Sequence, residues 1–437
     1  MYGGESTLPA VTANTHWLGS VCVLCGRDHP PQHRGFVCSG CGPDGILDPY
    51  YDYAQLAAAD PRALFGEATA GGMWRFAPLL PVRPTAAHGA WTLGDTPVHR
   101  ADRLAAHLGL KELLLKDDTC LPSGSLKDRA AAVAIAHARS VGARQLACAS
   151  TGNAAASLAV LGARAGSAVT IYVPASAPRP KLAQLVLHGA RVITVDGTYD
   201  QAFDLSLAAI AENGWYSRNC AHNSLLAEGK KTAGFELAAR LTAGFTRAED
   251  TLPDVVFVSV GDGCIVSATG KAFAELETLG LIGKVPRIIG VQAAGASPLA
   301  TAWAAHANPA GLVDGAAIMA AIRTAPVRTI ADSICVGVPR NRVKAWRRVA
   351  ASGGAFISVD DAAITAAVGL MARLAGVFAE PSAAAALAGV PVALQSGLIS
   401  RGDRVAVLVT GHGLKDPEAG LQGVSLPDPI PPAADRN

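Results

Sequence analysis

The sequence predicts an α/β protein in which parallel-rich sheets are flanked by helices. From about residue 112 onward, segments of strand length alternate with segments of helix length. Two strand segments, "VVFVSV" and "VAVLVT", are continuously apolar, as strands buried on both faces of a sheet usually are. The segments between strands are long enough for crossover helices, which parallel neighbours require.

The alternation also gives the order of the elements. Strands are expected at 112–118, 144–150, 167–174, 191–197, 215–219, 254–260, 286–293 and within 403–413. Helices are expected at 125–142, from Asn153 to about Ala165, at 179–189, at 199–214 and after the turn at 261–264. Gly142 marks the end of the first of these helices, since glycine commonly follows a helix C-terminus.

Composition excludes some partners. The 437 residues are 50% hydrophobic, and 37 Lys and Arg against 35 Asp and Glu leave a net charge of +2. Such a balance favours neither nucleic acid nor an anionic membrane surface as a partner. The N-terminus lacks the features of a secretory signal, and apolar runs are interrupted well before 18 residues. We therefore expect a cytoplasmic protein without a membrane span.

Four of the nine cysteines form a cluster near the N-terminus. Cys22, Cys25, Cys38 and Cys41 follow the pattern C-x2-C, twelve residues, C-x2-C, with a glycine after each pair. Four thiolates from two tight turns satisfy a structural, tetrahedral Zn²⁺. The alternative is a cluster that has lost its metal and whose cysteines only pack. The odd, dispersed remainder indicates reduced thiols.

Four loops after strands are candidates for chemistry, because ligands of open α/β sheets bind at the carboxyl ends of strands. One is "LPSGSLKDRAA", which places Lys127 at a helix start; another is "ASTGNAAAS", which begins a helix near Asn153 and offers N–H groups to a carboxylate. A third is "SVGDGCIVS", whose glycines permit a phosphate to approach a helix N-terminus, and the fourth is "LVTGHGLKD", with Thr410 at a strand end.

Each loop alone has an ordinary explanation as a tight turn or a helix cap, and the third matches neither the P-loop nor the G-x-G-x-x-G pattern. Together they supply a lone amine, a phosphate cradle, a carboxylate cradle and a hydroxyl. Pyridoxal phosphate needs an amine for a Schiff base, donors for its phosphate, a partner for its ring nitrogen and room for an amino acid.

The motifs resemble a known family. "KDDTCLPSGSLKDRAA" resembles the lysine motif of the fold-type-II pyridoxal-phosphate enzymes, and "TGHGLKD" is similar to a signature of their threonine-synthase branch. The resemblance extends from about residue 80 to 417 and includes "EGKKTAGFELA", "ADSICVGVPRN" and "GVFAEPSAAA". It implies a two-lobed fold, preceded here by a zinc-ribbon-like segment.

The resemblance implies a role for each matching residue. Lys127 would form the Schiff base and then transfer protons, Asn153 would bind the phenolate oxygen of the cofactor, and Thr410 would face the pyridine nitrogen. The cofactor phosphate would be held by Gly261, Asp262, Gly263, Cys264 and Ile265, and the substrate carboxylate by Ser150, Thr151 and Gly152. The Asp262 side chain would have to point away from the phosphate. A hydroxyl is a weak partner for the ring nitrogen, which suits elimination and replacement at the β or γ carbon.

The sequence departs from the family where threonine synthases bind the phosphate of their substrate. Anchored on Glu228 and Gly229, the family's Arg position is Leu226, and its Asn-Ser positions are Cys220 and Ala221. An apolar side chain cannot make the bidentate contact of Arg. Cationic and polar residues of the same stretch are candidates to replace it, namely Arg218, His222, Asn223, Lys230 and Lys231.

Three functions compete at this point. The leading one is the threonine synthase reaction, O-phospho-L-homoserine plus water giving L-threonine and phosphate, which would make the chain a carbon-oxygen lyase. The second is β-elimination or β-replacement on serine, threonine, phosphoserine or diaminopropionate, as in ammonia-lyases and cysteate-synthase-like enzymes. The third is a non-enzymatic binding module. The intact Lys127, Asn153 and Thr410 and the near-neutral charge disfavour the third.

The expected organisation is a zinc-ribbon-like segment at 1–45, a larger cofactor-binding domain at 46–134 and 226–423, a smaller domain at 135–225 and a disordered tail at 424–437. The family suggests a homodimer, and the expected ligand is a small amino acid. The basic run at 340–348, "RNRVKAWRR", is expected to be a solvated helix face.

Overall fold

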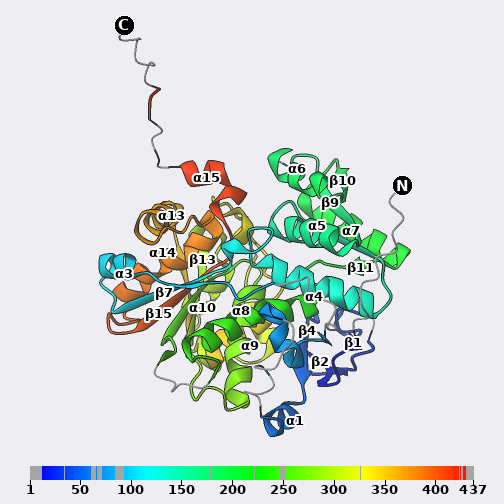
Figure 1. Cartoon of the computed structure of the whole chain (residues 1–437), viewed down its shortest axis with the longest axis horizontal. Coiled ribbons are helices and arrows are strands. Elements are labelled where there is room, and N and C mark those ends of the chain that lie inside the picture. Colours follow the sequence, from blue (N-terminus) through cyan, green and yellow to red (C-terminus); the bar gives the residue numbers. More distant parts are fainter. Residues whose placement is uncertain are drawn as a thin grey trace.

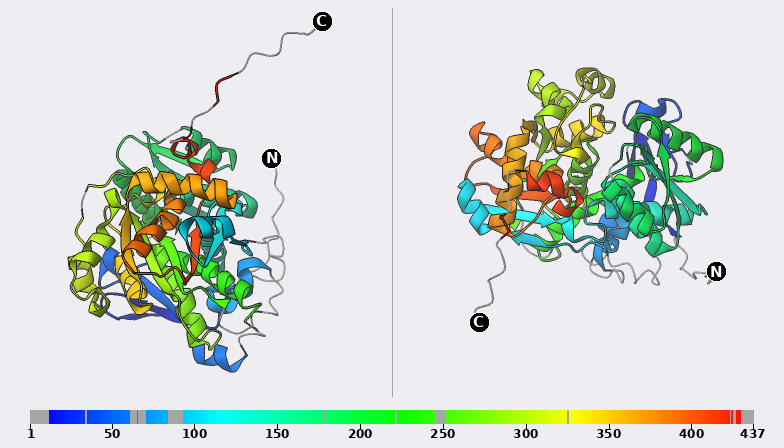
Figure 2. Two further views of the ribbon diagram at one scale, coloured as in Figure 1. Left: turned by 90° about the vertical axis from the view of Figure 1, so that its left-hand side faces the viewer. Right: turned by 90° about the horizontal axis from the view of Figure 1, so that it is seen from above.

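The structure is a computed structural model of the chain. It describes residues 12–33, 35–60, 65, 71–83, 93–177, 179–220, 222–245, 251–324, 326–422, 424 and 427–429. The expected disordered tail at 424–437 therefore falls mostly outside the described residues. Two lobes with central sheets are visible, and a small N-terminal unit lies against them (Figures 1 and 2).

The larger lobe is built on a six-stranded sheet in the order β14-β13-β12-β15-β7-β6. Every neighbouring pair is parallel except β6 with β7. The strands are β6 (Val98–Arg100), β7 (Glu112–Asp117), β12 (Val255–Ser259), β13 (Arg287–Ala293), β14 (Ala355–Val359) and β15 (Arg404–Val409). Since β15 lies between β12 and β7, strands from distant parts of the chain end side by side.

The smaller lobe contains a four-stranded, fully parallel sheet in the order β10-β9-β8-β11. Its strands are β8 (Gln145–Ala149), β9 (Ala168–Pro174), β10 (Arg191–Val195) and β11 (Tyr216–Ser217). All eight strands expected from the alternation are present, and most differ from the expected bounds by one or two residues at each end. The α/β class with parallel-rich sheets is confirmed.

Helices cover both faces of the large sheet because its strands are apolar on both faces. Val256 and Val258 of β12 belong to one buried core with α8 and α9, whereas Val255 and Phe257 belong to a second core with α13 and α14. The longer helices are α4 (Lys127–Ser140), α5 (Asn153–Ala165), α6 (Arg179–Leu187), α7 (Tyr199–Asn213), α8 (Leu225–Leu241), α9 (Cys264–Thr278), α10 (Pro298–Ala305), α12 (Arg342–Ala351), α13 (Asp361–Ala375) and α14 (Pro381–Gln395). Shorter ones are α1 (Tyr53–Ala58), α3 (Asp102–Leu108), α11 (Gly315–Ala321) and α15 (Pro417–Leu421).

The N-terminal unit is an antiparallel sheet in the order β3-β2-β4. Its strands are β2 (Trp17–Cys22), β3 (Asp28–His29) and β4 (Leu47–Tyr51), and a two-residue strand β1 (Thr12–Ala13) pairs with β5 (Val82–Arg83). The expected boundary at residue 45 separates β2 from its partner β4, which begins at Leu47, and the boundary at 134 falls within α4. The expected domain boundaries thus divide a sheet and a helix, and they stay a prediction.

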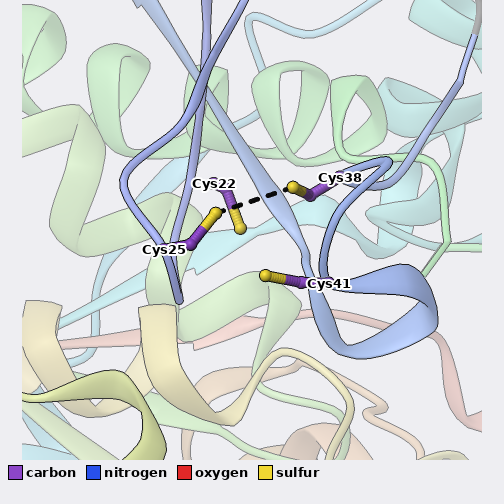
Figure 3. Close-up of side chains that lie close together, drawn as sticks. All are labelled: Cys22, Cys25, Cys38 and Cys41. Carbon is purple, nitrogen blue, oxygen red and sulfur yellow. Dashed lines mark hydrogen bonds between the residues drawn. The ribbon is translucent and has the colours of Figure 1, made fainter.

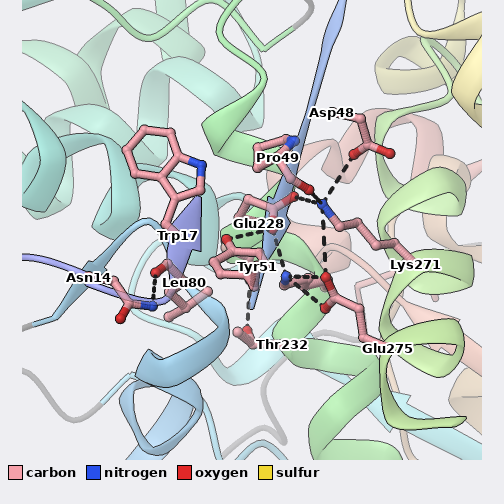
Figure 4. Close-up of polar contacts among 12 residues, drawn as sticks. Asn14, Trp17, Asp48, Pro49, Tyr51, Leu80, Glu228, Thr232, Lys271 and Glu275 are labelled. Atoms are coloured by element: carbon pink, nitrogen blue, oxygen red, sulfur yellow. Dashed lines mark hydrogen bonds and ion pairs between the residues drawn. The ribbon is translucent and has the colours of Figure 1, made fainter. Parts of the chain in front are cut away.

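A buried ion network joins this unit to the larger lobe (Figure 4). The Lys271 ammonium contacts Asp48 of β4 at 3.1 Å and Glu228 of α8 at 2.8 Å, and Lys231 contacts Glu228 at 2.6 Å. The Tyr51 hydroxyl also donates to Glu228, at 2.8 Å. An unpaired buried charge is costly. These ion pairs and hydrogen bonds therefore fix the position of β4 against α8 and α9.

The expectation of a solvated face at 340–348 is wrong. Lys344 is 4% exposed and its ammonium lies 2.8 Å from Asp48, which Arg348 also contacts at 3.1 Å. Trp346 is fully buried. The basic residues of α12 face the N-terminal unit, which supplies the Asp48 carboxylate. Asp48 is far from α12 in the sequence, so the residues around α12 do not predict this pairing.

Candidate active site

One cavity of about 640 Å³ collects the four loops singled out from the sequence. It lies where the carboxyl ends of β7, β8, β12 and β15 converge, as expected for an open α/β sheet. Its lining includes every residue predicted to bind cofactor or substrate, that is Lys127, Ser150, Thr151, Gly152, Asn153, Gly261, Asp262, Gly263, Cys264, Ile265 and Thr410.

Lys127 is the first residue of α4 and lines this cavity. Its Nζ has no hydrogen-bond acceptor among the described residues, and the residue is half-buried at the cavity wall. Burial, reinforced by the nearby charge of Lys230, lowers the pKa of Lys127 below that of a free amine. An amine of this kind is available as a nucleophile and as a proton acceptor.

The turn before Lys127 is held by the other end of the chain. The N–H of Leu126 donates to the Thr410 carbonyl at 2.9 Å, and the N–H of His412 donates to the Gly124 carbonyl at 2.9 Å. Gly124 has φ +76°, a conformation that glycine adopts without strain. The start of α4 is therefore fixed against the loop that follows β15.

The first turn of α4 is also anchored by Arg129. Its guanidinium contacts Asp118 at 2.7 Å and Glu236 at 2.6 Å, and all three side chains are buried. Lys116 contacts the same Glu236 at 2.7 Å. A guanidinium held on two sides cannot rotate freely, so it fixes the direction in which α4 presents Lys127.

The carboxylate cradle predicted from the sequence lies at the start of α5. Gly152 precedes the first helical residue, Asn153, and no side chain caps its N-terminal N–H groups. The Asn153 amide donates from Nδ2 to both oxygens of Glu380, at 2.8 and 3.0 Å. Burial raises the pKa of Glu380, and its bond to Asn153 opposes that rise.

Glu380 was not predicted as a site residue, although it lines the cavity and is 4% exposed. Its N–H donates to the Gly411 carbonyl at 2.9 Å, so it links Asn153 to the end of β15. The segment "GVFAEPSAAA" contributed to the family resemblance. The role of Glu380 in the site becomes visible only in the structure, where it accepts hydrogen bonds from Asn153.

The phosphate cradle predicted from the sequence lies at the start of α9. Gly263 precedes Cys264 with φ +86°, and no side chain caps the helix N-terminus. Uncapped N–H groups at the positive end of a helix suit a phosphate. The Asp262 carboxylate accepts a hydrogen bond of 3.3 Å from the backbone N–H of Arg340. This hydrogen bond partly compensates the negative charge of the carboxylate.

These features fit pyridoxal phosphate. The cavity offers an amine with a lowered pKa, an uncapped helix N-terminus with glycines beside it, and a hydroxyl at Thr410 on a neighbouring strand end. At Gly263 a Cβ atom would come within 2.8 Å of the Ala345 Cβ, which explains why only glycine fits there.

The residues around the expected substrate-phosphate position separate into two groups. Leu226 is fully buried in the core and does not line the cavity, and Ala221 lies outside the described residues. Of the five candidate replacements, Arg218 and Lys230 line the cavity. Lys231 is instead paired with Glu228 and Glu275. His222 and Asn223 are likewise absent from the described lining.

Cys220 lies between the two cations that line the cavity. The Nη1 of Arg218 is 2.9 Å from its Sγ, and the Nζ of Lys230 is 3.3 Å from it. Burial alone would raise the pKa of Cys220. The charges of Arg218, Lys230 and Lys127 outweigh burial and lower that pKa to about 6.

The four clustered cysteines converge in the N-terminal unit (Figure 3). Their Sγ atoms all lie within 4.8 Å of one another, and those of Cys25 and Cys38 are 3.7 Å apart. In a tetrahedron with Zn–S distances of about 2.3 Å, sulfurs are about 3.8 Å apart. Gly26 and Gly42 have φ of +71° and +63°, so each cysteine pair forms a matching turn. The donor set fits a structural zinc ion.

Among the described residues, no helix combines the length and the apolar character needed to cross a bilayer.

Comparison with known proteins agrees with this site. The family described as "Pyridoxal-phosphate dependent enzyme" matches residues 92–411. A protein named threonine synthase from Methanocaldococcus jannaschii is 34% identical over 93% of this chain and 95% of its own length. Another from Methanosarcina acetivorans is 35% identical over 91% and 92%, and one from Mycobacterium tuberculosis is 36% identical over 77% and 86%.

Solved structures share the fold at lower sequence identity. The diaminopropionate ammonia lyase of Escherichia coli has a TM-score of 0.62 and 17% identity, covering 96% of this chain and 98% of that one. The serine racemase of maize has a TM-score of 0.60 and 22% identity, covering 73% and 88%. At these identities the structures support the fold alone.

Proposed function

Because the chain belongs to the family of pyridoxal-phosphate-dependent enzymes, we propose that it catalyses the threonine synthase reaction, from O-phospho-L-homoserine and water to L-threonine and phosphate. The observation that carries the proposal is the cavity that unites Lys127 with the loops at Asn153, Gly263 and Thr410. Relatives named threonine synthase at 34–36% identity support the choice within the family. The reaction breaks a carbon-oxygen bond, which makes the chain a carbon-oxygen lyase.

The cavity lining supports a proposed set of residues that would hold the cofactor. The N–H groups from Gly261 to Ile265 would bind its phosphate, Asn153 would bind its phenolate oxygen, and Thr410 would face its pyridine nitrogen. When bound, the cofactor supplies an electron sink for charge that develops on the amino acid substrate. Ser150, Thr151 and Gly152 at the start of α5 would hold the substrate carboxylate.

Lys127 would carry the protons. The lowered pKa of this amine favours its neutral form, which can accept a proton from Cα and then from Cβ of the substrate. The pairing of its turn with Thr410 and the anchoring of Arg129 hold the amine at one place. A fixed amine serves consecutive proton transfers without rearrangement.

A second reaction is kept because Leu226 lies in the core and supplies no phosphate contact. The alternative is β-elimination or β-replacement on an amino acid such as serine, threonine, phosphoserine or diaminopropionate. The same lysine and the same two cradles would serve either reaction. The two reactions are therefore distinguished by which substrate the protein turns over.

The test offers purified protein with cofactor four substrates: O-phosphohomoserine, serine, threonine and O-phosphoserine. We expect threonine and phosphate from the first. Formation of a 2-oxo acid from serine or threonine, with O-phosphohomoserine unchanged, contradicts the proposal and supports the alternative. Lys127→Ala should lose turnover by about 10²-fold or more and lose the visible absorbance of bound cofactor. Lys284→Ala, at an exposed lysine outside the cavity, is the control.

The four-cysteine cluster is proposed to hold one structural zinc ion per chain, a role supported by the spacing of its sulfurs. Metal analysis of purified protein should find about one zinc per chain, and Cys25→Ser should lose it. Cys120→Ser changes a cysteine outside the cluster and should retain the metal. Wild-type protein without metal would contradict this assignment.

A further inference from the structure

Arg218, Cys220 and Lys230 form a cluster on the cavity wall, called here the cation–thiol cluster. The Arg218 and Lys230 side chains are 0% and 1% exposed as residues, and both line the cavity. Among the described residues, the Cys220 sulfur is the only hydrogen-bond partner of the Lys230 ammonium. Two buried cations that share one thiol are an unusual arrangement, since buried charges are normally paired with carboxylates.

Arg218 is only partly satisfied. Its Nη2 donates to the Ser157 hydroxyl at 3.1 Å and to the Lys127 carbonyl at 3.3 Å, and its Nη1 contacts Cys220. Its Nε is buried without a partner among the described residues. A guanidinium has five donors in a planar fork, and leaving one buried and unbonded carries a cost that a ligand oxygen would remove.

Other titratable groups around Cys220 do not supply the missing negative charge. Burial raises the pKa of Cys148 to about 12 and that of Cys264 to about 11, so both thiols stay neutral at pH 7. Burial also raises the pKa of Tyr199. The largest charge effects on Cys220 come from Arg218, Lys230 and Lys127, and all three are basic groups. Within the part of the chain that the structure describes, Cys220 is thus the one group that contacts both cations and can become an anion.

We propose that Arg218 and Lys230 form a subsite for a phosphate-type dianion on the substrate, and that the Cys220 thiolate occupies this subsite until the dianion binds, when Cys220 takes up a proton. The inference rests on the proposed function, because it names the residues that bind the leaving group of that reaction.

The chemistry of the exchange is simple. In the free site the thiolate is the counter-ion of both cations. A phosphate monoester brings three acceptor oxygens and about two negative charges, which a planar fork and an ammonium bind better than one sulfur. Two anions at one place repel each other, so the thiolate adds a proton from solvent and becomes a neutral thiol. No bond other than S–H is formed.

The inference accounts for the departure at Leu226. The family's Arg position faces the core here, while Arg218 approaches the cavity from the residue after β11, and Lys230 from α8. Arg218 and Lys230 therefore supply positive charge at the cavity in place of the family's Arg. Cys220 stands at one of the replaced polar positions, so its thiol belongs to this altered subsite.

The experiment measures alkylation of Cys220 by iodoacetamide in the holoenzyme, read by mass spectrometry of the peptide across pH 5 to 8.5. We expect a reactivity midpoint near pH 6, against about 8.5 for a free thiol. Saturating inorganic phosphate should slow the reaction about tenfold and move the midpoint upward, whereas chloride at equal ionic strength should not. Cys335, which lines the same cavity, is the internal reference.

Lys230→Met should weaken the protection by phosphate at least about tenfold, corresponding to about 1.4 kcal/mol. Its fold is checked by the absorbance of bound cofactor, and the wild-type measurement stands even if this variant does not fold. The inference would be overturned if cofactor alone protected Cys220 from alkylation and phosphate had no further effect. The cluster would then bind the phosphate of the cofactor. Equal reactivity with and without phosphate would overturn it too. Phosphate protection in a protein that does not turn over O-phosphohomoserine supports the subsite while the proposed reaction fails.

Discussion

The backbone N–H of Leu126 donates a hydrogen bond of 2.9 Å to the carbonyl of Thr410. The residue after Leu126 is Lys127, so the position of the amine depends on a strand end that comes near the close of the chain. A second bond, from His412 to Gly124, makes the contact a short antiparallel bridge. Two of the four sequence motifs are therefore one structural unit.

The first prediction concerns Glu380, which holds the Asn153 amide. Glu380→Ala removes both acceptors and leaves the amide free to rotate. We expect cofactor affinity to fall about tenfold, the equivalent of about 1.4 kcal/mol. Titration of cofactor-free protein with pyridoxal phosphate, followed by absorbance, measures the change.

Glu380→Gln is the matched control for this prediction. It keeps one carbonyl acceptor at nearly the same volume, so its affinity should stay within about threefold of wild type. If the alanine variant binds cofactor as tightly as wild type, Asn153 does not depend on Glu380.

The site shows what local sequence can and cannot predict. The loop around Gly263 was found because its glycines, strand and helix are adjacent in sequence. Glu380 was not found as a site residue, because its partner Asn153 is 227 positions away. Apolar patterning gives the strands, whereas pairing of polar groups between distant elements is set by the tertiary fold.

The same limit explains the error at α12. Basic residues such as Lys344 and Arg348 at helical spacing favour a solvated face unless a buried acid faces them. Asp48 is that acid, and it belongs to the N-terminal sheet. The four-cysteine cluster was predictable because its two turns contain all four ligands within a short stretch of chain.

The second prediction concerns Gly263 in the phosphate cradle. Gly263→Ala places a Cβ 2.8 Å from the Ala345 Cβ, at a residue with φ +86°. The backbone must shift away from the cradle, so we expect at least about a tenfold loss of cofactor affinity. Gly353→Ala has a similar φ of +67° with open space around its Cβ. This control should lose about 1 kcal/mol of stability and no affinity. An unchanged affinity in Gly263→Ala would show that the cradle tolerates the shift.

The third prediction tests the buried ion network. Lys271→Met removes the ammonium that contacts Asp48 and Glu228, and it leaves these carboxylates with fewer buried partners. We expect the free energy of unfolding to fall by about 3–5 kcal/mol, measured by denaturant titration. Arg100→Met breaks a pair with Asp102 in which the side chains are 63% and 72% exposed, so solvent screens the pair and the variant should lose far less stability. Equal losses in the two variants would contradict a special role for burial.

The fourth prediction concerns the pH dependence of stability at His137. Burial lowers the pKa of this imidazole to about 4, and its Nδ1 lies 2.9 Å from the Tyr216 hydroxyl. The unfolded chain has a His pKa of about 6.5, so the folded state favours neutral His137. Its contribution to stability is complete above pH 6.5 and is lost as pH falls toward 4. His137→Gln cannot take up the proton, so between pH 7.5 and 5 it should lose about 1–2 kcal/mol less stability than wild type. Urea unfolding at the two pH values measures this difference, with exposed His107→Gln as the control. The same pH dependence in wild type and His137→Gln would mean that another group is responsible for acid destabilisation.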